Sequence, residues 1–159
     1  GHAMQQAKEA KCLVALNICD TLVVQLHAEK LMELCTTYVD ILFANEMEAS
    51  ACTGREPKEA AAHLASKTNA IVVITQGDQG CYVAHKEKLF HSPANSVDVV
   101  DTTGAGDLFA AGFLFAFLRG DPLEECARTG NLLGGKVVSC VGTDLSSEEW
   151  LTIEREIGL

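Results

Sequence analysis

Short, mostly apolar runs alternate along the first half of the chain with longer stretches in which apolar residues recur at helical spacing. The apolar runs predict three buried strands, over residues 11–17, 39–44 and 70–75. The longer stretches predict three helices, over residues 26–38, 46–52 and 57–67. Because the strands are mostly apolar and do not alternate between apolar and polar residues, we expect a mostly parallel sheet that helices cover on both faces.

The pattern changes after the third of these strands. A glycine-rich turn at residues 77–80 is followed by two alternating segments, which predict a hairpin over residues 81–84 and 88–91. One further short strand is predicted over residues 97–100. Three helices are predicted to follow, over residues 107–118, 122–141 and 146–157. The order of elements therefore predicts a three-layer α/β/α fold with a mostly parallel sheet and an antiparallel hairpin at its edge.

Composition narrows the class of protein. Hydrophobic residues make up 48% of the 159 positions and charged residues 21%, which is typical of a folded domain. The 12 Lys and Arg residues against 22 Asp and Glu give a net charge of −10, which disfavours a sequence-independent grip on nucleic acid or on an anionic membrane surface. The longest apolar stretch, residues 108–118, is shorter than the roughly 20 residues that a membrane-spanning helix needs. We expect neither nucleic acid nor a membrane as a partner.

Cysteine usage and the first residues bear on the compartment and on the domain boundaries. The seven cysteines are odd in number and form no C-x-x-C pair, which predicts a reduced, cytoplasmic protein. Residues 1–4 (GHAM) resemble the remnant of a cleaved affinity tag. We therefore take residues 5–159 as the folded domain.

A glycine loop between a predicted strand and a predicted helix carries the candidate chemistry. This loop, residues 101–107 (DTTGAGD), has Gly104 and Gly106 where backbone N–H groups of a first helical turn can bind an anion. Asp107 lies in that turn, where the helix dipole favours the carboxylate, and it can accept a proton from a hydroxyl that attacks a phosphoryl group. A simple helix cap would not need two aspartates and two glycines. The segment predicts an anion site with a base beside it.

The same loop, with residues 110–113 (AAGF), resembles the second signature of the ribokinase-like (PfkB-type) carbohydrate and nucleoside kinases. Two further segments agree with that family in order and spacing: residues 45–48 (NEME) with its N-x-x-E motif and residues 75–80 (TQGDQG) with its T-x-G-x-x-G turn. Residues 43–46 (FANE) and residues 130–142 are most similar to the adenosine-kinase-like branch of the family. The resemblance extends from about Lys8 to Leu159.

This resemblance implies transfer of the γ-phosphoryl group of ATP to a hydroxymethyl group of a sugar or nucleoside. It implies that Asp107 is the catalytic base. The backbone of the preceding residues would stabilise the charge of the moving phosphoryl group; these are Thr103, Gly104, Ala105 and Gly106.

The resemblance also implies where ATP and metal ions bind. Thr75, Gly77 and Gly80 would approach the phosphates of the nucleotide. Asn45 and Glu48 would organise Mg²⁺ and its waters. Two residues of the helix predicted over residues 122–141 are candidates to line the adenine, Ala127 and Asn131. Asp101 and the region of residues 140–142 would hold a monovalent cation such as K⁺, as in some members of the family.

Family members are usually much longer, and the half that precedes Lys8 supplies the sugar-binding strands, the lid and the first glycine-pair signature. The chain is therefore expected to be the C-terminal, nucleotide-binding half of a kinase. On its own it should bind nucleotide weakly and catalyse poorly, and it should associate with a second copy or with a missing N-terminal half. The alternative is a non-catalytic nucleotide-binding module or a regulatory subunit. Ribose, fructose, another hexose and adenosine all stay open as acceptors.

Overall fold

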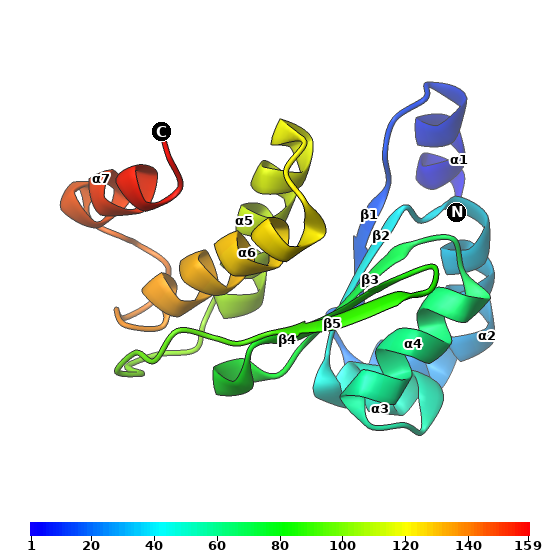
Figure 1. The fold of residues 1–159 in the computed structure, drawn as a ribbon. Helices are drawn as coiled ribbons and strands as arrows, with labels where there is room; N and C mark the ends of the chain where they lie inside the picture. The colour runs from blue at the N-terminus through cyan, green and yellow to red at the C-terminus, as the bar shows by residue number, and fades with distance from the viewer. The chain divides into compact units, whose positions relative to one another are not determined.

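The computed structural model describes all 159 residues (Figure 1). The elements follow one another as α1 (His2–Glu9), β1 (Ala15–Asn17), α2 (Thr21–Tyr38), β2 (Ile41–Asn45), α3 (Glu46–Thr53), α4 (Pro57–Lys67), β3 (Ile71–Thr75), the short 3₁₀ helix η1 (Gly77–Gln79), β4 (Cys81–His85), β5 (Lys88–Ser92), α5 (Ala105–Arg119), α6 (Leu123–Val137) and α7 (Ser147–Glu156). None of the helices combines the length and the apolar character that a membrane crossing requires.

The chain forms two compact units, which are described separately. The first comprises residues 1–76 and 82–91 and holds α1 to α4 and nearly all of the sheet. The second comprises residues 77–81 and 92–159 and holds η1 and α5 to α7.

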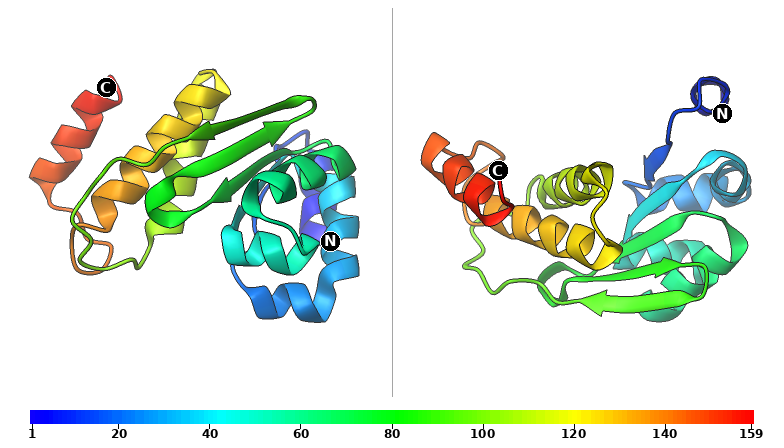
Figure 2. Two further views of the ribbon diagram at one scale, coloured as in Figure 1. Left: turned by 60° about the horizontal axis from the view of Figure 1, so that its bottom comes forward. Right: turned by 45° about the horizontal axis from the view of Figure 1, so that its top comes forward.

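The sheet has the strand order β1-β2-β3-β4-β5, so β1 is an edge strand. The first three strands are parallel, with Ala15 opposite Ile41 and Asn45 opposite Thr75, as predicted. β4 and β5 are joined by residues 86–87 only, a connection so short that the two strands form the predicted hairpin. Figure 2 shows this hairpin from two further directions.

Burial on β2 and β3 explains why these strands read as continuous apolar runs. One face of the two strands joins the core of the first unit, where it packs with residues of α2, α3 and α4; it carries Leu42, Ala44, Val72 and Ile74. The other face is also buried and carries Ile41, Phe43, Ile71 and Val73. The expectation that both faces of the parallel sheet are buried is therefore confirmed.

The strand predicted over residues 97–100 is wrong, because the structure has no strand between β5 and α5. Val99 and Val100 are 61% and 59% exposed. The backbone N–H groups of Val100 and Asp101 both donate to the carbonyl oxygen of Val138, at 2.8 and 3.2 Å. These groups are therefore satisfied by the end of α6 rather than by a neighbouring strand.

The ends of several elements also differ from the predictions. β1 is limited to three residues, Ala15–Asn17, and Lys11 lies in the turn after α1 with a left-handed φ of 59°. α2 begins at Thr21 and contains one non-helical residue, His27. Residues 2–4, which resemble a tag remnant, lie in α1, and Met4 packs against the core of the first unit.

In the second unit, α5 and α6 pack closely because glycines stand at their contact. A Cβ atom on Gly112 would lie 2.8 Å from the carbonyl oxygen of Thr129. A Cβ atom on Gly130 would lie 3.0 Å from the ring and the carbonyl oxygen of Phe109. Figures 1 and 2 show the two helices side by side, with α7 following. The two glycines therefore allow the backbones of α5 and α6 to approach closely.

α7 is fixed to the rest of the second unit by apolar and polar contacts. Ile153 and Ile157 join a buried cluster with leucines of α6. Arg119, at the end of α5, donates from Nη1 to the carbonyl oxygen of Ile157 at 2.7 Å.

Candidate active site

The start of α5 has the geometry of an anion site. Gly104 is the residue before the helix and has a left-handed backbone, with φ 77° and ψ 0°, and no side chain caps the helix there. The first-turn N–H groups of a helix have no acceptor within the helix, so those of Gly106 and Asp107 point outward without one. A Cβ atom on Gly106 would meet nothing within 4 Å. The positive end of the helix dipole is therefore open to a ligand.

Asp107 stands in this first turn and is exposed. Its carboxylate makes no hydrogen bond or ion pair within the chain. A carboxylate that is open to solvent beside an anion site has the position that a general base needs to reach a substrate hydroxyl. The structure thus brings together two of the predicted features, the glycine backbone and the base, on one helical turn.

The Asp101 carboxylate stabilises this loop by accepting three hydrogen bonds. Its Oδ1 accepts the N–H of Thr103 at 2.9 Å and the hydroxyl of Thr103 at 2.7 Å, while its Oδ2 accepts the N–H of Gly142 at 2.9 Å. The N–H of Thr103, then the N–H of Gly142, then the hydroxyl of Thr103 hold the pKa of the Asp101 carboxyl below its usual range. Asp101 therefore ties the glycine loop to the turn of residues 140–142, the two segments predicted to share a monovalent cation.

In the first unit, the NEME segment forms the start of α3. The side chain of Asn45 accepts the N–H of Glu48 at 2.8 Å. The Glu48 carboxylate accepts the backbone N–H of Asn45 with one oxygen and its side-chain NH₂ with the other, both at 2.9 Å. This capping box accounts for the N-x-x-E spacing by helix physics alone.

Asn45 and Glu48 are the residues predicted to organise Mg²⁺ and its waters. Glu48 is 4% exposed and both of its oxygens are engaged with Asn45. No three His, Cys, Asp or Glu side chains gather anywhere in the chain in a way that would hold a metal ion. Mg²⁺ in nucleotide sites takes most of its ligands from phosphates and water, so a single carboxylate that orders water is compatible with such a site.

The TQGDQG segment is divided between the end of β3 and the turn that follows. Thr75 ends β3, in register with Asn45 at the end of β2, as expected for polar strand ends at one edge of a parallel sheet. Gly77 begins η1 and has open space where a Cβ atom would stand. Gly80 has a φ of 95°, and a Cβ atom there would lie 2.1 Å from the carbonyl oxygen of Ser92. Close packing against this backbone explains why position 80 needs glycine.

Two residues predicted to line an adenine are buried instead. Ala127 is completely buried in the second unit. Asn131 is 7% exposed, and its NH₂ group faces the carbonyl oxygens of Ser92 and Pro93 and the hydroxyl of Ser92, each at 3.1 Å.

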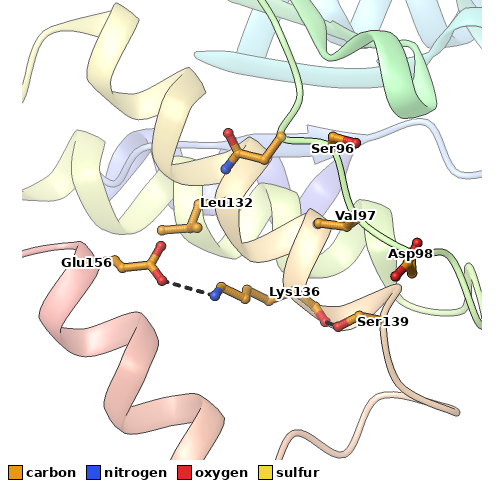
Figure 3. Close-up of a pocket in the computed structure, with 9 residues that line it drawn as sticks. Ser96, Val97, Asp98, Leu132, Lys136, Ser139 and Glu156 are labelled. Carbon is orange, nitrogen blue, oxygen red and sulfur yellow. Dashed lines mark hydrogen bonds and ion pairs between the residues drawn. The ribbon is translucent and has the colours of Figure 1, made fainter.

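The residues of α6 that line a cavity lie about one turn beyond Ala127 and Asn131. A cavity of about 500 Å³ is lined there by Leu132, Gly135, Lys136 and Ser139, by residues 95–98 and by Glu156 (Figure 3). Lys136 forms an ion pair with Glu156 at 3.0 Å at its edge. The sequence pattern does not predict this cavity, although the consecutive Gly134 and Gly135 interrupt the apolar pattern of α6 and indicate a close approach.

These two glycines place the cavity next to the start of α5. A Cβ atom on Gly134 would lie 3.2 Å from the carbonyl oxygen of Ala105, in the first turn of α5. A Cβ atom on Gly135 would lie 3.7 Å from Cγ1 of Val97, in the wall of the cavity. Consecutive residues of α6 thus contact the anion site and the cavity.

Comparison with known families agrees with these features. The model of the pfkB family carbohydrate kinases matches residues 1–150, and the chain belongs to this family. The fold is accordingly the three-layer α/β/α fold of the ribokinase-like kinases, here with an open, mixed sheet of five strands. Membership is consistent with phosphotransfer chemistry.

Individual relatives are sugar and nucleoside kinases. An uncharacterized sugar kinase of Archaeoglobus fulgidus is 33% identical over 70% of this chain and 44% of its own length. A cytidine kinase of Thermococcus kodakarensis is 43% identical over 58% of this chain and 34% of its own length. The crystal structure of an adenosine kinase from Sinorhizobium meliloti superimposes with a TM-score of 0.89 at 32% identity, over 98% of this chain and 48% of that one. The chain thus spans less than half of the length of each of these relatives.

Proposed function

We propose that this chain is the nucleotide-binding and catalytic-base part of a kinase that transfers the γ-phosphoryl group of ATP to a hydroxymethyl group of a sugar or nucleoside. The observation that carries the proposal is the uncapped, glycine-lined start of α5 with the free carboxylate of Asp107 on the same turn. Membership of the pfkB family and the similarity to cytidine and adenosine kinases support it.

In the proposed reaction, the acceptor hydroxyl gives its proton to the carboxylate of Asp107 as its oxygen attacks the γ-phosphorus. The bond between the γ-phosphorus and the bridging oxygen breaks, and ADP leaves. The outward N–H groups at Gly106 and Asp107 stabilise the negative charge on the transferring group. Gly106 contributes by leaving this backbone accessible, as the open space there supports, and Gly104 contributes by adopting the left-handed backbone that precedes the helix.

We further propose that the cavity beside α6 takes the base of the nucleotide. Val97 and Leu132 give it apolar walls and Gly135 leaves room between them. Because Gly134 packs on the first turn of α5, a base in this cavity lies on the same part of α6 as the phosphate site. In this proposal Leu132 and Gly135, rather than Ala127, contact the base of the nucleotide. It leaves Thr75, Gly77 and Gly80 as proposed neighbours of the phosphates.

Mg²⁺ bound with the nucleotide would neutralise phosphate charge. Glu48, positioned by Asn45, is the proposed residue that orders its waters. Asp101 is the proposed ligand of a monovalent cation such as K⁺, because its carboxylate already joins the glycine loop to residues 140–142. All seven cysteines are free, which is compatible with the cytoplasmic location that we propose.

Phosphotransfer is proposed to need more residues than this chain provides. Because the relatives have about as many further residues, we propose that phosphotransfer needs the remaining part of the kinase fold, supplied as a missing N-terminal half. A nucleotide-binding module without turnover is the second candidate, favoured only by this difference in length. The free carboxylate of Asp107 favours the kinase, since a binding module has no use for a base there.

Titration calorimetry with Mg·ATP tests the phosphate site directly. We expect the chain and its Asp107→Asn variant to bind, and Gly106→Asp to lose binding, because the new carboxylate would stand at the anion site. Ala62→Asp, which adds a carboxylate at an exposed position of α4, is the matched control and should bind as the parent does. Equal affinity for the Gly106→Asp variant and the parent would refute the phosphate site. Circular dichroism of each variant shows that the fold is retained.

A further inference from the structure

A buried polar cluster surrounds Asn131 in the second unit. Its two amide hydrogens face three oxygen acceptors, the carbonyl oxygens of Ser92 and Pro93 and the hydroxyl of Ser92, all at 3.1 Å from Nδ2. The sulfur of Cys81 lies 4.0 Å from the same nitrogen. Asn131 and Ser92 are 7% and 8% exposed, so water cannot easily replace these hydrogen bonds.

The same segment is held from a second direction. Gly80 packs so closely that a Cβ atom there would lie 2.1 Å from the carbonyl oxygen of Ser92 and 2.6 Å from the backbone nitrogen of Ala94. Residues 92–94 are therefore fixed between the turn at Gly80 and the amide of Asn131. Neither contact involves an exposed side chain.

The fixed segment leads directly into the cavity wall. Residues 95–98 form one side of the cavity and follow Pro93 by two positions. On the opposite side, Leu132 lines the cavity and follows Asn131 in sequence. The hydrogen bonds of Asn131 thus connect α6 to the segment that leads into residues 95–98, next to the place where both line the cavity.

We propose that Asn131 is a positioning residue for the nucleotide: its amide sets the separation between residues 95–98 and α6, and through it the affinity for the base. The inference rests on the proposed function, since it takes the cavity as the site of the base. It gives Asn131 a role that requires no direct contact with the ligand. It also distinguishes binding of the base, which depends on Asn131, from binding of the phosphates at the start of α5, which does not.

Asn131→Asp tests the proposal with little change in shape. It replaces the NH₂ donor by an oxygen that faces two carbonyl oxygens. Asn131→Leu removes the donor without adding charge and serves where the first variant folds poorly. Ser92→Ala is the matched control, because it removes one acceptor but leaves the two carbonyl acceptors of the amide.

Two measurements separate this inference from the proposed function. Amide hydrogen exchange without any nucleotide should become about tenfold faster at Val100 and Asp101 in the Asn131 variants and change little in Ser92→Ala. The N–H groups of these two residues follow the segment of residues 95–98 and donate to the carbonyl oxygen of Val138 at the end of α6, so their exchange reports its separation from α6. Titration should show about tenfold weaker binding of Mg·ADP and unchanged binding of inorganic tripolyphosphate, which has no base.

The outcomes are distinct. Unchanged exchange at Val100 and Asp101 in both Asn131 variants would overturn the positioning role. Equal losses of affinity for Mg·ADP and tripolyphosphate would overturn it as well, since they would indicate a general loss of structure. If the parent chain binds neither compound, the proposed function is at fault, and the exchange measurement still decides whether Asn131 holds the segment.

Discussion

Thr143 packs against Gly104 so closely that a Cβ atom on Gly104 would lie 2.4 Å from Cγ2 of Thr143. The neighbouring Gly142 donates its N–H to Asp101, so the turn of residues 142–143 holds the glycine loop at its first residue and at its middle. The shape of the proposed anion site is therefore set by a segment almost forty residues further along the chain, as well as by its own glycines.

Gly104→Ala should destabilise the protein for two separable reasons. The left-handed backbone costs a residue with a side chain about 1–2 kcal/mol, and the contact with Thr143 adds to this. Urea denaturation of Gly104→Ala, Thr143→Ser and the double variant forms a cycle that measures the second part. We expect the two changes to compensate in part. Simple additivity would show that the two residues are not in contact in solution.

Gly112→Ala should also reduce stability, by about 1–3 kcal/mol, because its Cβ atom would meet the backbone of Thr129 and push α5 away from α6. Gly135→Ala is the matched control on α6, since its Cβ atom would stand in ordinary contact with Val97 at 3.7 Å. It should leave stability unchanged or raise it by about 0.5–1 kcal/mol through helix propensity. Thermal melts of the two variants give the comparison, and equal effects would contradict the close packing at Gly112.

Thr129→Val should stabilise the protein by about 1 kcal/mol, because the Thr129 hydroxyl is buried without a hydrogen-bond partner. Thr68 provides the contrast. Its hydroxyl donates to the carbonyl oxygen of Leu64 at 2.9 Å and accepts the N–H of Ala70 at 3.3 Å. Thr68→Val should therefore destabilise by about 1–3 kcal/mol. Chemical denaturation of both variants checks the prediction, and a loss of stability in Thr129→Val would mean that its hydroxyl is bonded.

Alkaline pH should weaken the fold through the buried thiols. Burial raises the pKa of Cys81 to about 12, against an ordinary value of 9.0, despite the opposing effect of its hydrogen bond with Asn131. Burial likewise raises the pKa of Cys35 to about 11. In the unfolded chain these thiols lose their protons near pH 9, whereas in the folded chain they keep them. The stability they contribute is thus complete below pH 9 and is lost as the pH rises towards 12.

Denaturation curves between pH 8 and 10.5 measure this loss. Cys81→Ala should reduce the slope by up to about 1.4 kcal/mol per pH unit above pH 9. Cys12→Ala is the control, because Cys12 is an exposed thiol. An unchanged slope in Cys81→Ala would show that Cys81 is not shielded from solvent.

Asp107→Asn tests the chemistry in a chain that carries the whole kinase fold. The turnover number should fall by about 10²–10⁴, while the affinity for Mg·ATP stays within a factor of a few. Steady-state kinetics with a sugar and a nucleoside acceptor measure both quantities. Retained turnover would exclude Asp107 as the base.

The sequence was most informative where local and tertiary requirements agree. β2 and β3 are buried on both faces, so their apolar runs had one sensible interpretation. Gly54 and Pro57 mark the end of α3 and the start of α4 by their own backbone geometry. Residues 97–100 show the opposite case. Their apolar character does not say whether a neighbouring strand exists, and their N–H groups found the carbonyl of Val138 instead.

The candidate site divides in the same way. Gly104, Gly106 and Asp107 lie within four positions at the start of α5, so the sequence alone indicates that they share one turn. The cavity depends on residues 95–98, on α6 and on Glu156, three segments that only the tertiary fold brings together. The burial of Asn131 depends on the same long-range packing, and no pattern within α6 distinguishes it from a residue that faces a ligand.

The unpaired edge of β1 has a consequence for how the protein behaves in concentrated solution. Residues 15–17 have a neighbouring strand on one side only, and Leu13, Leu22 and Leu26 are exposed in the same part of the chain. The net charge of −10 keeps copies apart at low ionic strength. Salt shortens the reach of this repulsion to about 10 Å at 0.1 M. Self-association should therefore increase as salt is added, and purification at low ionic strength should keep the chain monodisperse.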